Sequence, residues 1–284
     1  MDGALFIGLM SGTSLDGVDA VLLETVAHEY RVSHSHFNAF SPEIRQQLLG
    51  LHHSGDNELE RVAAVANALS HLYADTVVQL LAKAGIRNTA VQAIGCHGQT
   101  IRHRPEIGFT LQIGNPALLA ELTGITVVAD FRSRDIAAGG QGAPLVPAFH
   151  QAVFQHASIH RVVINIGGIA NLTSLPVNGQ PVSGFDSGPG NMLMDAWIER
   201  IRGQAYDKDG LWAGEGKVIE PLLQELLTEP FFTLSPPKST GRDLFSLAWL
   251  INRISKNYAD ADIQRTLLEL TAQTIANAVR RYCV

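Results

Sequence analysis

Cysteine is scarce in this sequence of 284 residues, which contains only Cys96 and Cys283. Two cysteines cannot build a disulfide framework, and neither has the neighbours that a zinc site requires. No apolar stretch reaches the roughly 18 residues that a membrane-spanning helix needs. The composition therefore points away from disulfide-rich secreted proteins and from integral membrane proteins.

Positive charge is also in short supply, with 21 lysines and arginines against 27 acidic residues and a net charge of −6. The basic residues are not clustered, which argues against a nucleic-acid-binding surface. The N-terminus lacks the basic start and cleavage site of a signal peptide, so we expect a cytoplasmic protein. The 46% apolar content and the length are sufficient for two domains of ordinary size.

Residues 4–23 form the most distinctive stretch of the sequence. The apolar runs Ala4 to Met10 and Val18 to Leu23 have strand length, and Gly, Ser, Thr and Asp residues separate them. Ordinary hairpin turns use the same residue types. However, simple hairpins have loops of about two to five residues, and this one is longer. Glycines that let N–H groups converge, hydroxyl donors and Asp16 as a ligand for hydrated Mg²⁺ together predict a phosphate-binding loop.

The rest of the first half alternates between helical and strand patterns, which predicts an α/β protein. We expect strands at 31–40, 91–96, 109–113 and 125–129, and helices from Pro42, over 58–84 and over 116–123. The polar run His97-Gly98-Gln99-Thr100 follows a predicted buried strand, where open α/β sheets place their ligands.

Two segments near the middle of the chain carry further predictions. Asp130 to Asp135 follows the predicted strand at 125–129, and its charges either rim the sheet or let Arg132 bind a carboxylate bidentately. The glycine-rich segment 139–142 marks a change of composition. We therefore predict two domains, residues 1–135 and residues 136–284.

The second half opens as the first does, with an apolar strand, a Gly167-Gly168 turn and a second apolar strand over 161–175. A short strand and a glycine-rich turn around Asp186 then precede a helix over 192–202. Asp186 either caps or complements that helix, or acts as a general base. Further helices are predicted over 145–155, 217–227 and 260–282.

Seven motifs, in order, resemble those of the anhydro-N-acetylmuramic acid kinases, which belong to the superfamily of actin, Hsc70 and sugar kinases. They are Gly8-Leu-Met-Ser-Gly-Thr-Ser-Leu-Asp-Gly-Val-Asp19, His97-Gly-Gln-Thr, Asp130-Phe-Arg, the segment from Gly139, Asn165-Ile-Gly-Gly, Gly184-Phe-Asp-Ser-Gly-Pro-Gly-Asn and Lys238-Ser-Thr-Gly-Arg. An aspartate stands at position 243, where the family more often has glutamate. The resemblance implies a two-lobed, actin-like ATPase fold of ribonuclease H type with an interlobe cleft.

The implied reaction is the ATP-dependent conversion of 1,6-anhydro-N-acetylmuramic acid to N-acetylmuramic acid 6-phosphate in peptidoglycan recycling. The resemblance makes Asp186 the catalytic base and implies an amino-sugar substrate, ATP, Mg²⁺ and a homodimer. The nucleotide-binding residues would be Gly12, Thr13, Ser14, Leu15, Asp16, Gly17, Val18, Asp19, Gly167 and Gly168, and the substrate-binding residues His97, Gln99, Arg132 and Asn191. Metal ligands are left unassigned.

In the family, a strand and a glycine-rich adenosine-binding loop follow a helix such as 260–282, whereas this sequence stops at Val284. The resemblance therefore implies an incomplete adenine pocket, with reduced nucleotide affinity or no activity. Two alternatives stay open. One is a non-catalytic actin-like or Hsc70-like nucleotide-binding module, and the other is a kinase of the same superfamily that acts on another small molecule.

Overall fold

The structure is a computed structural model that describes residues 3–26, 29–177, 179–242 and 244–283. The chain forms two compact units, Met1–Gly142 and Ala143–Val284. The boundary falls seven residues later than predicted, because the glycine-rich segment is tied to the first unit: the Gly142 N–H donates to Asp135 Oδ2 at 2.7 Å. Among the described residues, no helix combines the length and the apolarity needed to cross a membrane.

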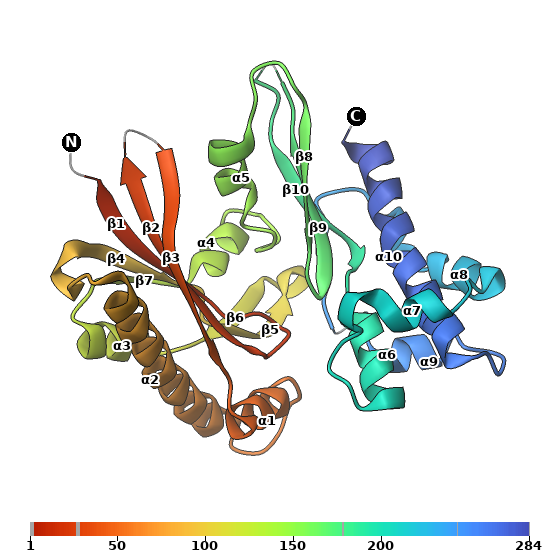
Figure 1. The fold of residues 1–284 in the computed structure, drawn as a ribbon, viewed down its shortest axis with the longest axis horizontal. Coiled ribbons are helices and arrows are strands. Elements are labelled where there is room, and N and C mark those ends of the chain that lie inside the picture. Colours follow the sequence, from red (N-terminus) through yellow and green to blue (C-terminus); the bar gives the residue numbers. More distant parts are fainter. Residues whose placement is uncertain (1–2, 27–28, 178, 243, 284) are drawn as a thin grey trace. The chain divides into compact units, whose positions relative to one another are not determined.

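The first unit is built on a five-stranded sheet with the order β3-β2-β1-β4-β7 (Figure 1). Strands β1 (Ala4–Met10), β2 (Gly17–Val26) and β3 (Glu29–Ala39) form an antiparallel meander, as predicted. Strand β4 (Val91–Cys96) is parallel to β1, and the short β7 (Val127–Val128) is parallel to β4. The mixed sheet and its helices confirm the predicted α/β class.

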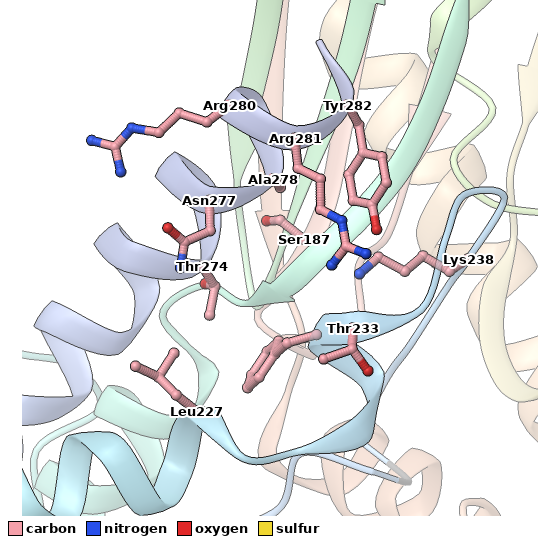
Figure 2. Close-up of a pocket in the computed structure, with 11 residues that line it drawn as sticks. Ser187, Leu227, Thr233, Lys238, Thr274, Asn277, Ala278, Arg280, Arg281 and Tyr282 are labelled. Carbon is pink, nitrogen blue, oxygen red and sulfur yellow. The ribbon is translucent and has the colours of Figure 1, made fainter. Parts of the chain in front are cut away.

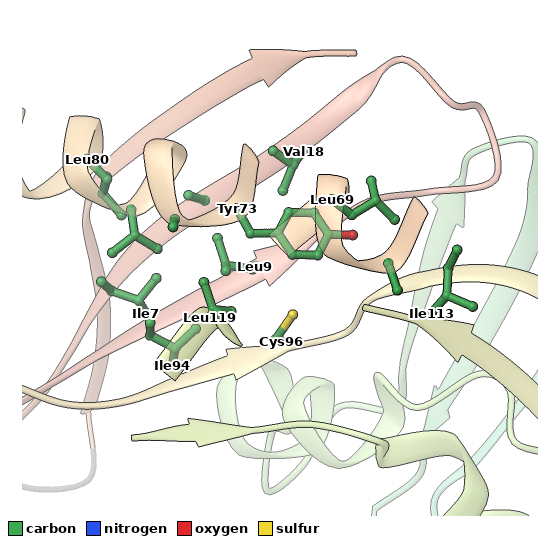
Figure 3. Packing of buried hydrophobic residues seen from close by; sticks show 14 of the residues in the cluster. Ile7, Leu9, Val18, Leu69, Tyr73, Leu80, Ile94, Cys96, Ile113 and Leu119 are labelled. Carbon is green, nitrogen blue, oxygen red and sulfur yellow. The ribbon is translucent and has the colours of Figure 1, made fainter. Parts of the chain in front are cut away.

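Helices cover one face of this sheet. Helix α1 (Pro42–Leu51) is capped by Ser41, and α3 (Pro116–Thr123) is capped by Asn115. Helix α2 (Glu58–Ala84) has the predicted bounds and packs its apolar stripe into the core of the unit. The buried residues of that stripe include Val77 and, as Figure 3 shows, Leu69, Tyr73 and Leu80.

Three features of the first unit differ from the sequence-based expectation. Residues after His97 form a hairpin of β5 (Gln99–Arg104) and β6 (Phe109–Ile113), with the turn η2 (Pro105–Ile107) between them. The strand expected at 125–129 is reduced to the two residues of β7. The charged segment after it forms α4 (Phe131–Ala137) instead of a rim of loop. Apart from these differences, a short 3₁₀ helix, η1, covers Asn88–Ala90 before β4.

The second unit repeats the opening meander, with β8 (Arg161–Ile166), β9 (Ile169–Leu175) and β10 (Ser183–Pro189) in the order β10-β9-β8. Helix α5 (Pro147–Phe154) precedes it. The long α10 (Asp260–Tyr282) packs against β9 and β10, where Ile275 and Ala278 meet Leu172 and Phe185 in one buried cluster.

The remaining helices of the second unit share a separate core, which also includes residues of α10. Trp197, Leu223, Phe245 and Trp249 are among its large buried side chains. The elements are α6 (Met192–Arg202), η3 (Lys208–Gly210), α7 (Leu211–Glu215), α8 (Glu220–Leu227), η4 (Pro230–Thr233) and α9 (Leu247–Ile251).

The end of α2 yields a stability prediction. Gly85 terminates the helix with φ of 67°, a conformation that costs an L side chain about 1 kcal/mol or more. Gly85→Ala should therefore lower the free energy of unfolding by about 1 kcal/mol in urea denaturation followed by circular dichroism. Gly214→Ala is the matched control, since it lies within α7, has no positive φ and leaves its new methyl in open space. An equal loss in both variants would contradict the argument.

Candidate functional site

The loop between β1 and β2 is held by the side chain of Leu15. Leu15 has φ of 58°, which a bulky residue adopts only when its surroundings enforce it. Its side chain is buried in the core of the first unit, while Thr13, Ser14 and Asp16 beside it are exposed. Val18 is likewise fully buried. Of the predicted nucleotide-binding residues, the apolar ones anchor the loop and the polar ones face outward.

The exposed side of the loop concentrates polar groups. Asp16 Oδ1 accepts hydrogen bonds from Ser14 Oγ at 2.8 Å and from the Gly17 N–H at 3.0 Å. Partial burial, together with the negative charge of Asp16, raises the pKa of Asp19 above its usual value. Two neighbouring carboxylates of this kind suit a hydrated divalent cation, because a cation removes their mutual repulsion.

Gly17 is required where the loop enters β2. A Cβ at this position would lie 2.6 Å from the Phe37 ring and would also collide with the Asn38 carbonyl of β3. The absence of a side chain therefore lets the start of β2 lie close against β3.

A buried hydrogen-bond network supports the loop from below. Ser11 Oγ donates to the Gly98 carbonyl at 3.2 Å and lies 2.8 Å from the Tyr73 hydroxyl. Because the single serine proton is directed to Gly98, Tyr73 donates to Ser11. Burial raises the pKa of the Tyr73 hydroxyl well above its usual value, so this donor stays protonated. In Figure 3 the Tyr73 ring lies among the core side chains, and its hydroxyl is directed away from Ile7 and toward Ile113.

Gln99 belongs to the same support. Its side chain is fully buried, and Nε2 donates to the Gly12 carbonyl at 3.1 Å. The backbone reinforces the contact, since the His97 N–H donates to the Leu9 carbonyl. The structure thus places Gln99 behind the loop, with its side chain enclosed and its Oε1 without a hydrogen-bond partner among the described residues, and its contact with substrate stays a prediction.

His97 and Arg132, both predicted to bind substrate, are in direct contact. His97 Nδ1 donates to the Gly98 carbonyl at 2.7 Å, and Nε2 accepts from Arg132 Nε at 2.8 Å. Burial and the neighbouring guanidinium lower the pKa of His97 to about 4, so the imidazole is neutral at physiological pH. Arg132 Nη1 also donates to the Gly142 carbonyl. His97 and Gly142 together fix the direction of the Arg132 guanidinium.

A cavity of about 200 Å³ lies beside His97. Its lining includes Cys96 at the carboxyl end of β4, together with Ala129 and Asp130, which follow β7. Parallel strands β4 and β7 therefore end at the cavity, which is the expected position of a ligand in such a sheet.

In the second unit, Asp186 lies within β10 rather than in the turn predicted after it. The pairing of β10 with β9 shifts register between Asp186 and Gly188, so a bulge follows the aspartate. Such bulges redirect side chains at functional sites. Asp186 is only 5% exposed, and Asn171 of β9 is its direct cross-strand neighbour.

Residues 238–240 run alongside Asp186 and fix it through the backbone. The Asp186 N–H donates to the Lys238 carbonyl at 3.1 Å, and the Thr240 N–H donates to Asp186 Oδ2 at 2.9 Å. A hydrogen bond from an N–H group stabilises the charged carboxylate. This gives the Lys238-Ser-Thr-Gly-Arg motif a structural role. Asp243, which follows the motif, lies outside the described residues.

The Gly167-Gly168 turn joins this group through its carbonyls. Gly168 O accepts from the Gly190 N–H at 2.8 Å, and Gly167 O accepts from the Asn191 N–H at 2.9 Å. A Cβ at Gly190 would collide with the Gly167 carbonyl, so only glycine permits this approach. The Asn191 side chain is exposed at the start of α6. Gly167, Gly168 and Asn191 are therefore neighbours within the second unit, just beyond the end of the strand that carries Asp186.

Sequence reasoning missed two residues of these groups. Tyr73 reads as one more apolar position of α2, and no local pattern shows that its hydroxyl reaches Ser11. Asn171 carries a weak signal, because it is the amide side chain within a strand whose other polar residues, Thr173 and Ser174, are hydroxylic. Its Oδ1 is buried and has no hydrogen-bond partner among the described residues, and cross-strand neighbours share one face of the sheet.

A repeated meander, with a glycine- and hydroxyl-rich loop in one unit and a backbone-held aspartate in the other, is typical of actin-like phosphotransferases. The family model described as anhydro-N-acetylmuramic acid kinase matches residues 4–284, and the chain belongs to that family.

Curated relatives carrying the same name are similar over almost the whole chain. The Nitrosomonas europaea protein is 56% identical over 279 residues, which are 98% of this chain and 77% of the relative. The Bordetella pertussis protein is 55% identical over 98% of this chain and 74% of its own length. The Pseudomonas putida protein is 52% identical over 97% and 76%, respectively. The relatives thus extend beyond the matched region.

The Tyr73 contact yields a prediction on nucleotide binding. Tyr73→Phe removes the donor to Ser11 while keeping the ring in the core, so the loop loses one buried hydrogen bond worth about 1 kcal/mol. We expect the KM for ATP to rise about fivefold, with kcat changed much less. Tyr206→Phe is the control, since Tyr206 is 60% exposed. Equal effects in both variants would argue against a positioning role, and so would a lower melting temperature of Tyr73→Phe with an unchanged KM.

The neutral state of His97 yields a prediction on pH. Its folded pKa of about 4 lies below the usual value, so between pH 4 and 6.5 the unfolded chain binds more protons than the folded one. The free energy of unfolding should fall as the pH drops through this window, by up to about 1.4 kcal/mol per pH unit. His97→Gln should flatten this dependence in urea titrations at several pH values, whereas His53→Gln, an exposed control, should leave it unchanged.

Proposed function

We propose that this protein phosphorylates 1,6-anhydro-N-acetylmuramic acid with ATP and opens its anhydro ring, which yields N-acetylmuramic acid 6-phosphate and ADP. The observation that carries the proposal is Asp186, a buried carboxylate held by the Thr240 N–H beside a strand bulge. Membership of the anhydro-N-acetylmuramic acid kinase family supplies the substrate class.

Asp186 serves as the general base. It takes a proton from a water molecule as that water attacks the anomeric carbon, and the bond from this carbon to O6 breaks. O6 then attacks the γ-phosphorus in line, and ADP leaves with the electrons of the broken bond. The backbone contacts of residues 238–240 support this role, because they keep the carboxylate fixed in position. Asn171, on the same face of the sheet, is suited to orient the water.

The β1–β2 loop would bind the phosphates of ATP. The exposed hydroxyl of Thr13 is suited to donate to phosphate oxygens, and that of Ser14 would do so once Asp16, its present acceptor, binds the cation. The adjacent carboxylates of Asp16 and Asp19 fit a hydrated Mg²⁺. When bound, this ion would neutralise charge on the transferring phosphoryl group.

Arg132 would bind the lactyl carboxylate of the substrate. A guanidinium recognises a carboxylate through paired hydrogen bonds, provided that its plane is fixed. The bonds to His97 and the Gly142 carbonyl supply that constraint. The exposed Asn191 is suited to bind another polar group of the sugar.

The proposed assembly is a homodimer that works in the cytoplasm, where ATP is available. The family resemblance is the support for both statements. Light scattering on the purified protein would measure the assembly, and fractionation of cells would test the location.

The direct test is mass spectrometry of the anhydro sugar after incubation with protein, ATP and Mg²⁺. Wild-type protein should give a ring-opened, phosphorylated product, and Asp186→Asn should reduce the rate by at least about a hundredfold because it cannot accept the proton. Asp209→Asn is the matched control, because Asp209 is exposed and adopts a left-handed conformation that asparagine tolerates. Full activity of Asp186→Asn would refute the assignment, and absence of product from the wild type would refute the reaction.

A further inference from the structure

A second cavity, of about 470 Å³, lies in the second unit where α10, β10 and η4 meet (Figure 2). Its floor is closed by Ser187, Thr274 and Ala278, none of which is more than 6% exposed. Its rim carries Arg280 and Arg281 in the last turn of α10, both exposed. The volume lies within the range of roughly 300 to 1,000 Å³ that is typical of small-molecule sites.

All the charged side chains described in the lining of this cavity are positive. Lys238, Arg280 and Arg281 line it, and none of the described residues along its wall is acidic. Lys238 is only 6% exposed, and its Nζ donates to the Phe231 carbonyl at 3.0 Å. Within the described parts of the chain, no carboxylate lies at ion-pair distance from this ammonium. Lys238 is thus a buried cation whose nearest hydrogen-bond acceptor is neutral.

The positive charges of Lys238 and Arg281 repel each other within the cavity. Figure 2 shows the Arg281 guanidinium directed toward the Lys238 ammonium. Burial lowers the pKa of Lys238, and the charge of Arg281 lowers it further, against the opposing effect of Asp186. The dipole of α10 favours arginines in its last turn. The Phe231 ring, with its centroid 4.6 Å from Lys238 Nζ, stabilises the buried ammonium but supplies no negative charge to offset Arg281. An anion between the two side chains would remove the repulsion.

We propose that this cavity binds a phosphate monoester, with the phosphate group between Lys238 and Arg281. An arginine can bind two phosphate oxygens at once, and the lysine adds a compact positive charge. The Leu227 and Phe232 side chains along the wall provide apolar surface for the organic part of the ligand.

The site is connected to Asp186 by the chain itself. Lys238, whose ammonium lines the cavity, accepts a hydrogen bond from the Asp186 N–H at its carbonyl. Two residues later, the Thr240 N–H donates to Asp186 Oδ2. A ligand that shifts Lys238 would therefore change the position of Asp186. If a second ligand binds at Asp186, each of the two ligands changes the affinity of the other by the same factor. The effect on turnover rests on the proposed function of Asp186, whereas the binding does not.

The experiment is calorimetric titration of the protein with glucose 6-phosphate, with glucose as the uncharged comparison and without ATP. Wild-type protein should bind the phosphate ester and not glucose. Arg281→Gln should weaken binding about tenfold, as expected for loss of a charged hydrogen-bond donor. Arg265→Gln, which removes the same charge from another position of α10, should leave the affinity unchanged. Equal affinities of the two variants, or no binding by the wild type, would overturn the proposal.

A phosphate ester could instead occupy the β1–β2 loop, and one further variant separates the two sites. Ser14→Ala alters the exposed side of that loop, and the proposal requires that it bind glucose 6-phosphate as the wild type does. Loss of binding in Ser14→Ala with retention in Arg281→Gln would assign the ligand to the loop and refute the cavity. Because these titrations need no turnover, their outcome is independent of the Asp186→Asn test.

Discussion

The hydrogen bond between the buried hydroxyls of Ser11 and Tyr73 connects the longest helix of the first unit to its polar loop. The loop begins where β1 ends, and its backbone at Gly12 is held by the enclosed amide of Gln99. Buried polar groups are costly unless they are paired, so these bonds select one loop conformation. The same pairing lets Leu15 keep an unfavourable φ, because its side chain has a place only in that conformation.

The second unit uses backbone groups for the same purpose. Asp186 is positioned by two main-chain groups, the carbonyl of Lys238 and the N–H of Thr240. The close approach of Gly190 to the Gly167 carbonyl then brings the start of α6 to the same place. Both candidate sites therefore consist of a few exposed or reactive groups on a scaffold that is mostly buried, in which Gln99 Oε1, Asn171 Oδ1 and Thr240 Oγ1 are buried without a hydrogen-bond partner among the described residues.

The long periodic helices and the two opening hairpins were predictable, because their patterns are local in the sequence. The helices 58–84, 192–202 and 260–282 have the predicted bounds, and the glycine after 84 ends the first of them. Helix α4 was missed because its charged residues fit a loop equally well. The bulge after Asp186 and the enclosure of Gln99 depend on partners far away in sequence, which no local pattern encodes. Sequence motifs identified the candidate residues. Only the tertiary contacts show which of them are exposed and which are buried and hold the loops in place.

The two sheets differ in the sequence separation between their paired strands. In the second unit, Val162 pairs with Ser174 and Ser174 with Ser183, so the whole meander closes through short loops. In the first unit, β1 must also pair with β4, and Leu5 finds Val91 only after α1 and α2 have been passed. Loop-closure entropy and contact order both slow such non-local pairing. We therefore expect the β8–β10 meander to form early, and the loop carried by β1 to acquire its final shape late in folding.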